Sequence, residues 1–170
     1  MGSRLARLLR HRWVDERSVR RALPAEALDR LEAQVAQSER HHSGEIRVCV
    51  EAGLPLSYLW RGAPARERAV ALFGKLRVWD TEHNNGVLIY LLLADHEIEL
   101  VVDRGLDRCV PAEHWATMVR ELSRALRAGR FEEGLSQALA AVDALLVQHY
   151  PLAGDAPNAN ELTNTVHVIA

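Results

Sequence analysis

The sequence predicts an α/β domain built on a small mixed sheet of three to four strands, sandwiched between helices. Three observations predict this class. Apolar residues recur at helical spacing in several segments of the 170-residue chain. The run from Val87 to Ala94 is apolar at all eight positions, which is typical of a strand covered on both faces. A short polar turn joins that run to a second strand-like segment, so the two are expected to form an antiparallel hairpin.

The predicted elements of the central domain fill residues 23–151. In order, they are a helix over about 24–41, a strand over 45–51, a loop over 53–64, a helix from 64, strands over 87–93 and 97–103, and helices over 111–129 and 131–151. Residues 45–51 alternate apolar and polar, which predicts a half-buried strand with Glu45, Arg47 and Cys49 on its open face. The helix between the first two strands favours a parallel pair with a right-handed crossover.

Residues 1–22 are predicted to form a basic, helical N-terminal extension, since they carry seven arginines against two acids. The residues on or near one face of this helix are Leu5, Leu8, Leu9 and Arg12. Two interpretations stay open. The helix either docks on the domain or frays, or residues 4–13 make a peripheral contact with a membrane surface.

Residues 152–170 are predicted to form a flexible C-terminal tail, because residues 152–165 are rich in Ala, Asn, Pro and Gly. The closing TVHVI leaves another possibility open, since it could add an edge strand to the sheet or pair with another chain.

Composition limits the classes of function. The hydrophobic fraction of 48% is enough for a real core. The net charge of −2 gives no overall field for nucleic acid, so no nucleic-acid partner is expected. The first residues lack the apolar core of a secretory signal. A cytoplasmic location is therefore expected, with possible peripheral contact at the inner membrane.

Acidic and amide side chains gather at one end of the predicted hairpin. Asp80, Glu82 and Asn85 precede its first strand, and the antiparallel return brings Asp103 back to the same end. Carboxylate and amide oxygens are the ligands that Ca²⁺ prefers, although the full calcium-loop pattern is absent. A metal site formed by Asp80, Asn85 and Asp103 is one interpretation. An ordinary turn between a helix and a strand is the other.

Several conspicuous residues are interpreted as structural. The turn Asp95–Glu97 lies at the opposite end of the hairpin and is expected to be a solvated tip. Neither a nucleophile elbow nor a phosphate-binding loop is present. The tryptophans are interpreted as core or rim residues rather than a platform for stacking bases, and they are Trp13, Trp60, Trp79 and Trp115.

The assembled pattern resembles the TPM domain family, most closely its compact bacterial members, over about residues 13–151. The segments that carry the resemblance are Asp15 ahead of a helix, S-G-E-I-R-V from Ser43, Leu72-Phe73 with Trp79, N-N-G-V-L-I-Y-L from Asn84, E-L-V-V-D-R-G-L from Glu99 and F-E-E-G-L from Phe131. The resemblance implies a small sheet between helices, with a divalent cation, often calcium, at the end of the sheet. Asp15, Asn85 and Asp103 match the family's site positions.

Three functions are therefore in competition. The first is a divalent-metal-binding interaction module linked to membrane-protein maintenance, with calcium or magnesium bound and an unknown protein partner. The second, implied by the phosphatase activity of the family's plant relative, is a metal-dependent hydrolase in which Asp80 or Asp103 acts as base or nucleophile. The third is a structural domain without metal.

Overall fold

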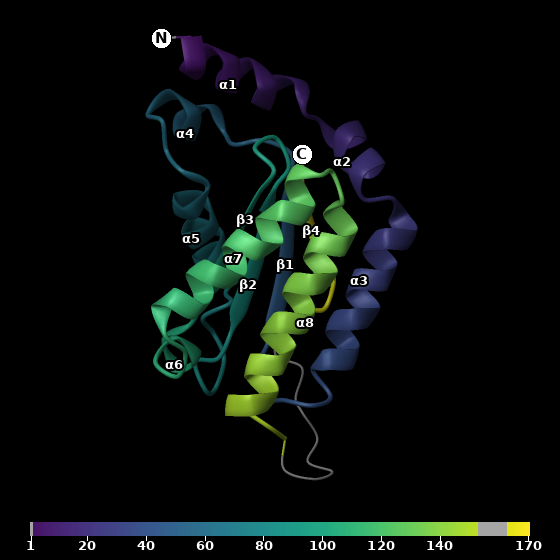
Figure 1. Ribbon diagram of the computed structural model, residues 1–170, viewed down its shortest axis with the longest axis vertical. Helices are drawn as coiled ribbons and strands as arrows, with labels where there is room; N and C mark the ends of the chain where they lie inside the picture. The colour runs from purple at the N-terminus through teal and green to yellow at the C-terminus, as the bar shows by residue number, and fades with distance from the viewer. Residues whose placement is uncertain (1, 153–162) are drawn as a thin grey trace.

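A four-stranded mixed sheet organises the described part of the chain, which in this computed structural model comprises residues 2–152 and 163–170. Its strands are β1 (Ile46–Glu51), β2 (Val87–Leu92), β3 (Glu97–Val102) and β4 (His167–Ile169). Their order across the sheet is β3-β2-β1-β4. The β1 strand is parallel to β2 and β4, and β2 is antiparallel to β3 (Figure 1). The predicted α/β class, with its crossover and hairpin, is confirmed.

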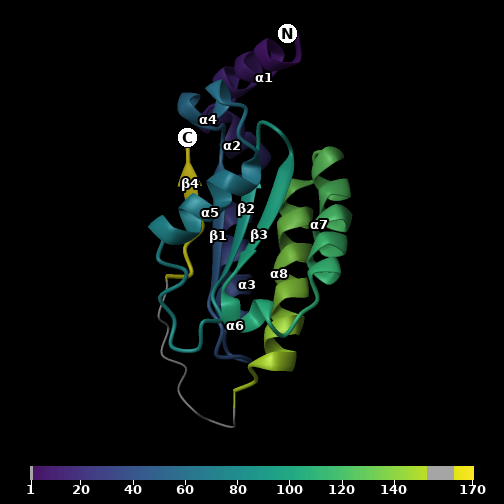
Figure 2. The ribbon, with the colours of Figure 1, turned by 90° about the vertical axis from the view of Figure 1, so that its left-hand side faces the viewer.

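Helices cover both faces of the sheet. They are α1 (Gly2–Trp13), α2 (Glu16–Ala22), α3 (Ala25–Ser38), α4 (Leu56–Trp60), α5 (Ala65–Lys75), α6 (Arg104–Asp107), α7 (Ala112–Arg127) and α8 (Phe131–His149). The long helices α3, α7 and α8 cover one face, and α5 covers the other (Figure 2). At the ends of the sheet, α1 and α4 lie beyond the carboxyl ends of β1 and β2, while α6 lies at the amino ends (Figure 1). The short helix α4 forms inside the segment that the sequence predicts as a loop.

The β2 strand is buried at every position, as its continuous apolar sequence predicts. Alternate side chains enter two separate cores. Val87, Ile89 and Leu91 pack under α3 and α8. Leu88 and Tyr90 pack under α5. The pattern is therefore continuous because helices cover both faces of this strand.

The prediction that β1 is only half-buried is wrong. Cys49, on the face expected to be open, is buried, and so is Glu51, which follows on the same face two residues later. Arg68 of α5 reaches the Glu51 carboxylate with Nε and a terminal nitrogen, at 2.9 and 2.6 Å. The Tyr90 hydroxyl donates to the same carboxylate at 2.6 Å. Glu51 can therefore be buried although it is charged, because α5 supplies the counter-charge through Arg68.

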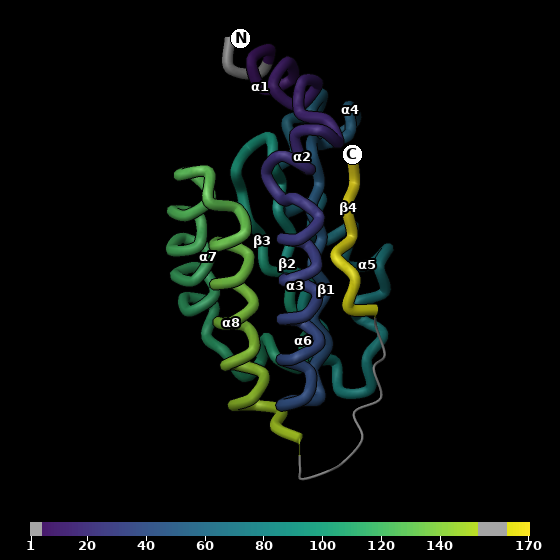
Figure 3. Tube along the Cα trace, turned by 90° about the vertical axis from the view of Figure 1, so that its right-hand side faces the viewer, coloured from purple at the N-terminus to yellow at the C-terminus, as the bar shows by residue number. Residues whose placement is uncertain are grey.

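The closing segment forms the edge strand that the sequence left as a possibility. Figure 3 shows β4 running along β1 at the edge of the sheet. Two side chains hold the residues that lead into it. Glu32 of α3 accepts from the Val166 N–H at 2.9 Å, and Arg47 of β1 donates to the Thr163 carbonyl. Residues 153–162 of the predicted flexible tail lie outside the described residues.

Candidate functional site

Asn85 and Asp103 meet at the amino edge of the sheet, as the hairpin geometry predicts. The Asp103 N–H donates to the carbonyl of Gly86, the residue after Asn85, at 2.9 Å. The Asn85 amide lies 3.4 Å from the Ser43 hydroxyl, which belongs to the segment before β1. Three chain segments therefore converge at this edge, and both Asn85 and Asp103 are buried there.

Asp103 carries an oxygen without a donor. Its Oδ1 caps α6 by accepting from the Arg104 N–H at 2.7 Å. Asp103 as a whole is only 8% exposed. Its Oδ2 is buried and has no hydrogen-bond partner among the described residues. A buried carboxylate oxygen in this state costs free energy unless a cation or a water satisfies it. Oδ2 of Asp103 is therefore the atom at this edge that is best suited to bind a cation.

Backbone carbonyls of the turn before β2 approach Gly105, two residues after Asp103. The Gly105 N–H donates to the Asn84 carbonyl at 2.8 Å. A Cβ on Gly105 would lie 2.4 Å from that oxygen and 2.6 Å from the His83 carbonyl oxygen, so only glycine fits. Tyr150 closes the same corner, and burial, the Cys109 thiol and the charge of Asp103 raise the pKa of its hydroxyl. The corner thus combines one carboxylate with neutral oxygens.

The other three predicted ligands are not buried with Asn85 and Asp103. Asp80 is exposed and paired with Arg77, and Glu82 is exposed. Asp15 caps α2 and lies beside Ala52, which follows β1 at the opposite edge. Since the six residues of β1 span roughly 20 Å, Asp15 is too far from Asn85 to share one ion with it.

The donor set at the amino edge fits a hard cation only weakly. Calcium takes about six to eight oxygen ligands, usually with several carboxylates. Among residues 2–152 and 163–170, no group of three His, Cys, Asp or Glu side chains is arranged to hold a metal. Glu39 accepts from the Ile46 N–H at this edge, and burial raises the pKa of its carboxyl to about 7. Metal binding by Asp103 and Asn85 stays a prediction.

A second polar cluster lies at the opposite edge, where the sequence suggests only a solvated hairpin tip. That prediction is wrong for Asp95, whose side chain is 5% exposed. Arg7 and His11 of α1 reach its Oδ2 at 3.0 and 3.1 Å, and Arg10 binds Oδ1. Burial would raise the pKa of Asp95, but His11 and Arg7 outweigh it and hold that pKa well below its usual value. Arg7, Arg10 and His11 are three and four residues apart, which places them on one face of a helix. This spacing was the signal in the sequence for a basic cluster.

The contacts of Asp95 with Arg7, Arg10 and His11 hold the polar face of α1 against the domain. His11 is buried, and its Nδ1 accepts from the Leu54 N–H at 2.9 Å, which leaves the ring proton on the nitrogen facing Asp95. Gly53 lies so close that a Cβ there would be 2.8 Å from the His11 carbonyl oxygen. The interpretation that the N-terminal helix docks on the domain is therefore confirmed for α1.

The opposite side of α1 is apolar and exposed. The neighbouring helix α4 (Figure 1) also carries exposed apolar side chains, and we call the two sets together the α1–α4 apolar surface. Its members are Leu5, Leu9, Trp13, Leu56 and Trp60. Trp13 and Trp60 are 83% and 84% exposed, so the prediction that the tryptophans are core or rim residues is wrong for these two. Large exposed apolar side chains gathered on two neighbouring helices are typical of an interaction surface.

The architecture defines a class of protein, namely a small α/β domain with a mixed sheet between helices, polar clusters at both sheet edges and an apolar surface on its N-terminal helix. The TPM domain model matches residues 19–145. The chain belongs to the TPM domain family.

The solved structures that are similar to this chain include the following two. The BA42 protein of the psychrophilic bacterium Bizionia argentinensis is 27% identical, with a TM-score of 0.74 over 86% of this chain and 94% of that one. The N-terminal domain of a P. gingivalis protein is 19% identical, with a TM-score of 0.57 over 77% and 82% of the two chains, and supports the fold alone. No curated protein matches the chain. In the part of the chain that the structure describes, no helix is long and apolar enough to cross a membrane.

Proposed function

We propose that this protein is a non-catalytic interaction module that rests on a membrane surface through the α1–α4 apolar surface. The observation that carries the proposal is the orientation of α1. A helix at a protein surface normally turns its apolar stripe towards the core. Here Arg7, Arg10 and His11 face the domain, while Leu5 and Trp13 face outward.

The chemistry of the exposed face suits a lipid interface. Tryptophan favours the boundary between headgroups and hydrocarbon, and leucine favours the hydrocarbon itself. Arg12 lies on the exposed side beside Trp13, where it can meet anionic headgroups. On the cytoplasmic face of an inner membrane, the module would meet membrane proteins laterally. A role in their maintenance, with one of them as partner, is part of this proposal.

Vesicle binding tests the proposal. The full chain is expected to co-sediment with vesicles containing anionic phosphatidylglycerol, and Trp fluorescence is expected to shift to the blue. Trp13→Ser combined with Trp60→Ser should weaken binding at least tenfold, because both side chains are the most exposed members of the surface. Trp79→Ser is the matched control, since Trp79 is half exposed but lies outside the surface. Equal binding by the double variant and the control would contradict the proposal.

A divalent cation is a second candidate ligand, favoured by the unpartnered Asp103 Oδ2. Asp103 would supply the charge, while the Asn85 amide and the carbonyls of His83 and Asn84 would supply neutral oxygens. One carboxylate predicts weak binding, with a Kd on the order of 10⁻³ M. The ion would neutralise a buried charge and tighten this corner of the domain. The hydrolase remains a weaker proposal, since Asp80 pairs with Arg77 and Asp103 caps α6.

Titration with Ca²⁺ and Mg²⁺, followed by residue-resolved NMR, tests this candidate. Shifts are expected at Asn84–Gly86 and Asp103–Gly105 and not at Asp15. Asp103→Asn should abolish these shifts, because it removes the charge. The asparagine oxygen can still accept from the Arg104 N–H and cap α6. Unchanged spectra at tens of millimolar metal would support the alternative of a domain without metal. Hydrolysis of a phosphomonoester by the same samples, lost in Asp103→Ala, would favour the hydrolase instead.

A further inference from the structure

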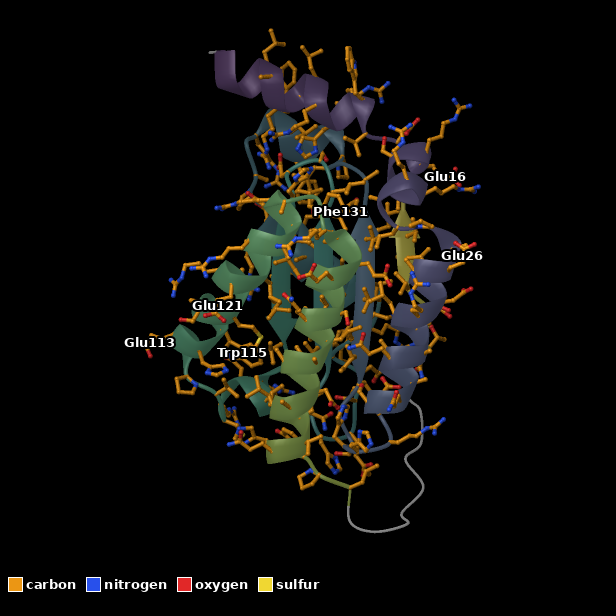
Figure 4. The ribbon with its side chains drawn as sticks, turned by 45° about the vertical axis from the view of Figure 1, so that its right-hand side comes forward. Glu16, Glu26, Glu113, Trp115, Glu121 and Phe131 are labelled. Atoms are coloured by element: carbon orange, nitrogen blue, oxygen red, sulfur yellow. The ribbon has the colours of Figure 1, made fainter. Side chains whose placement is uncertain are left out.

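A pocket of about 420 Å³ lies between the N-terminal helices and the body of the domain. It is bounded by the α1–α2 segment, the β2–β3 turn and the turn between α7 and α8. Phe131 marks its position at the end of α8 nearest α2 (Figure 4). The volume falls within the range of about 300–1,000 Å³ that small-molecule sites occupy. The pocket shares no residue with the α1–α4 apolar surface or with the Asp103 corner.

The inner lining of the pocket is hydrocarbon. Leu93, Ala94 and Phe131 are buried side chains whose surfaces border the cavity. Val14 and Ala22 are partly buried and pack against the same core. Transfer of an apolar chain from water onto such a lining is favourable by about 25 cal/mol for each Å² removed from water.

The charged groups that line the pocket are all basic. Arg21 is exposed and makes no ion pair with any described residue. Arg10 binds Asp95, but Asp95 also binds Arg7, so two guanidinium groups share this one carboxylate. Glu97 lies in the field of Arg10 but does not line the pocket.

His96 links the two parts of the pocket. Its ring stands edge-on to Phe131, with centroids 5.1 Å apart and planes at 87°. Its backbone adopts a left-handed conformation, with φ of 52°, at the end of the β2–β3 turn. The imidazole thus borders the apolar lining, while the residue as a whole is exposed to solvent.

We infer that this pocket binds one monomeric anionic amphiphile, that is, a carboxylate or phosphate head carried on an apolar chain. The chain would cover Leu93 and Phe131, and the head would lie between Arg21 and Arg10. The head would meet the exposed guanidinium groups of two arginines, with which an anion forms charge-assisted hydrogen bonds. Because the ligand would touch both α1–α2 and the body of the domain, its binding would also strengthen the docking of the N-terminal helices.

Calorimetric and NMR titration with three probes tests this inference. Decanoate, below its micelle concentration, combines head and chain, while decanol has only the chain and acetate only the head. Decanoate is expected to bind at least tenfold more tightly than either control probe. Backbone shifts are expected at Leu93, Ala94, His96 and Phe131. Dodecyl phosphate in place of decanoate identifies which anionic head the pocket prefers.

Two arginines of the same helix provide matched variants. Arg21→Gln should weaken decanoate binding at least fivefold, whereas Arg17→Gln should leave it unchanged, because Arg17 is exposed outside the pocket. Both variants are expected to fold, since both side chains are exposed. Trp13→Ser combined with Trp60→Ser should keep decanoate binding even where vesicle binding is lost, which separates this site from the membrane surface.

Four results would overturn the inference. They are absence of decanoate binding at millimolar concentration, equal affinity for decanoate and decanol, equal loss in the two arginine variants, and shifts confined to the α1–α4 apolar surface. The first excludes the site. The second removes the role of the basic groups, the third indicates diffuse charge attraction, and the fourth assigns the binding to the exposed tryptophans.

Discussion

Replacement of Glu51 with alanine is expected to lower the free energy of unfolding by about 3–5 kcal/mol, because it leaves a buried arginine without its counter-charge. The Glu51 residue is 1% exposed, and its two oxygens accept from both Arg68 and Tyr90. In the alanine variant the Arg68 guanidinium would lose its carboxylate partner, and the Tyr90 hydroxyl would lose its acceptor. A domain of this size has a total stability of about 5–15 kcal/mol, so the variant is expected to be only marginally folded. Urea unfolding followed by circular dichroism at pH 7 measures the effect.

Two controls separate the loss of the counter-charge from the loss of side-chain volume. The triple variant Glu51→Leu, Arg68→Met, Tyr90→Phe replaces the whole polar group by apolar side chains, and is expected to be within about 2 kcal/mol of the parent protein. Glu67→Ala breaks the exposed pair of Glu67 with Arg61 and should leave the unfolding midpoint unchanged. If Glu51→Ala were as stable as Glu67→Ala, the pair would not be buried in solution as described.

Gly86→Ala is expected to destabilise the protein by on the order of 3 kcal/mol, through overpacking against the backbone. A Cβ at this position would lie 1.9 Å from the Val78 carbonyl oxygen and 3.0 Å from its carbon. These are backbone atoms of the segment that covers the start of β2, so relief requires the segment to move. Because β2 is the buried centre of the sheet, the displacement would spread to the Asn85–Asp103 corner. Thermal unfolding measures the change, and NMR reports on the corner.

Gly74→Ala is the matched control for this prediction. Gly74 lies in α5 with no heavy atom within 4 Å of the added Cβ and without a positive φ. Alanine there should stabilise the helix by roughly 0.5–1 kcal/mol. Equal stability of Gly86→Ala and Gly74→Ala would mean that Val78 does not pack on Gly86 as described.

The N-N-G turn was predicted correctly, but its glycine is needed for a reason other than turn conformation. The sequence predicts a turn from three residues that favour turns. In the structure Asn84 takes the left-handed conformation, with φ of 52°. Gly86 is instead required by the contact with Val78. The motif therefore records both local backbone conformation and tertiary packing, and only the first can be inferred from residue type.

The Asp103 corner was predictable in part. Sequence distance along a hairpin of known register places Asp103 opposite Gly86, next to Asn85, because antiparallel pairing is a local rule. The position of Asp15 was not predictable in this way. It depends on how α2 packs at the far edge of the sheet, and no local rule specifies that packing.

The sequence by itself determined the long helices, the central strand and the hairpin, because each depends on periodicity or on residues close together in the chain. Only the tertiary structure decided which charged residues are buried. Glu51 and Asp95 look like solvent-facing acids in sequence, yet Arg68 and the arginines of α1 cover them. Their counter-charges lie on other elements, and pairing across such distances follows from the packing of the whole chain. For the same reason, only the structure showed that α1 presents its apolar side to solvent.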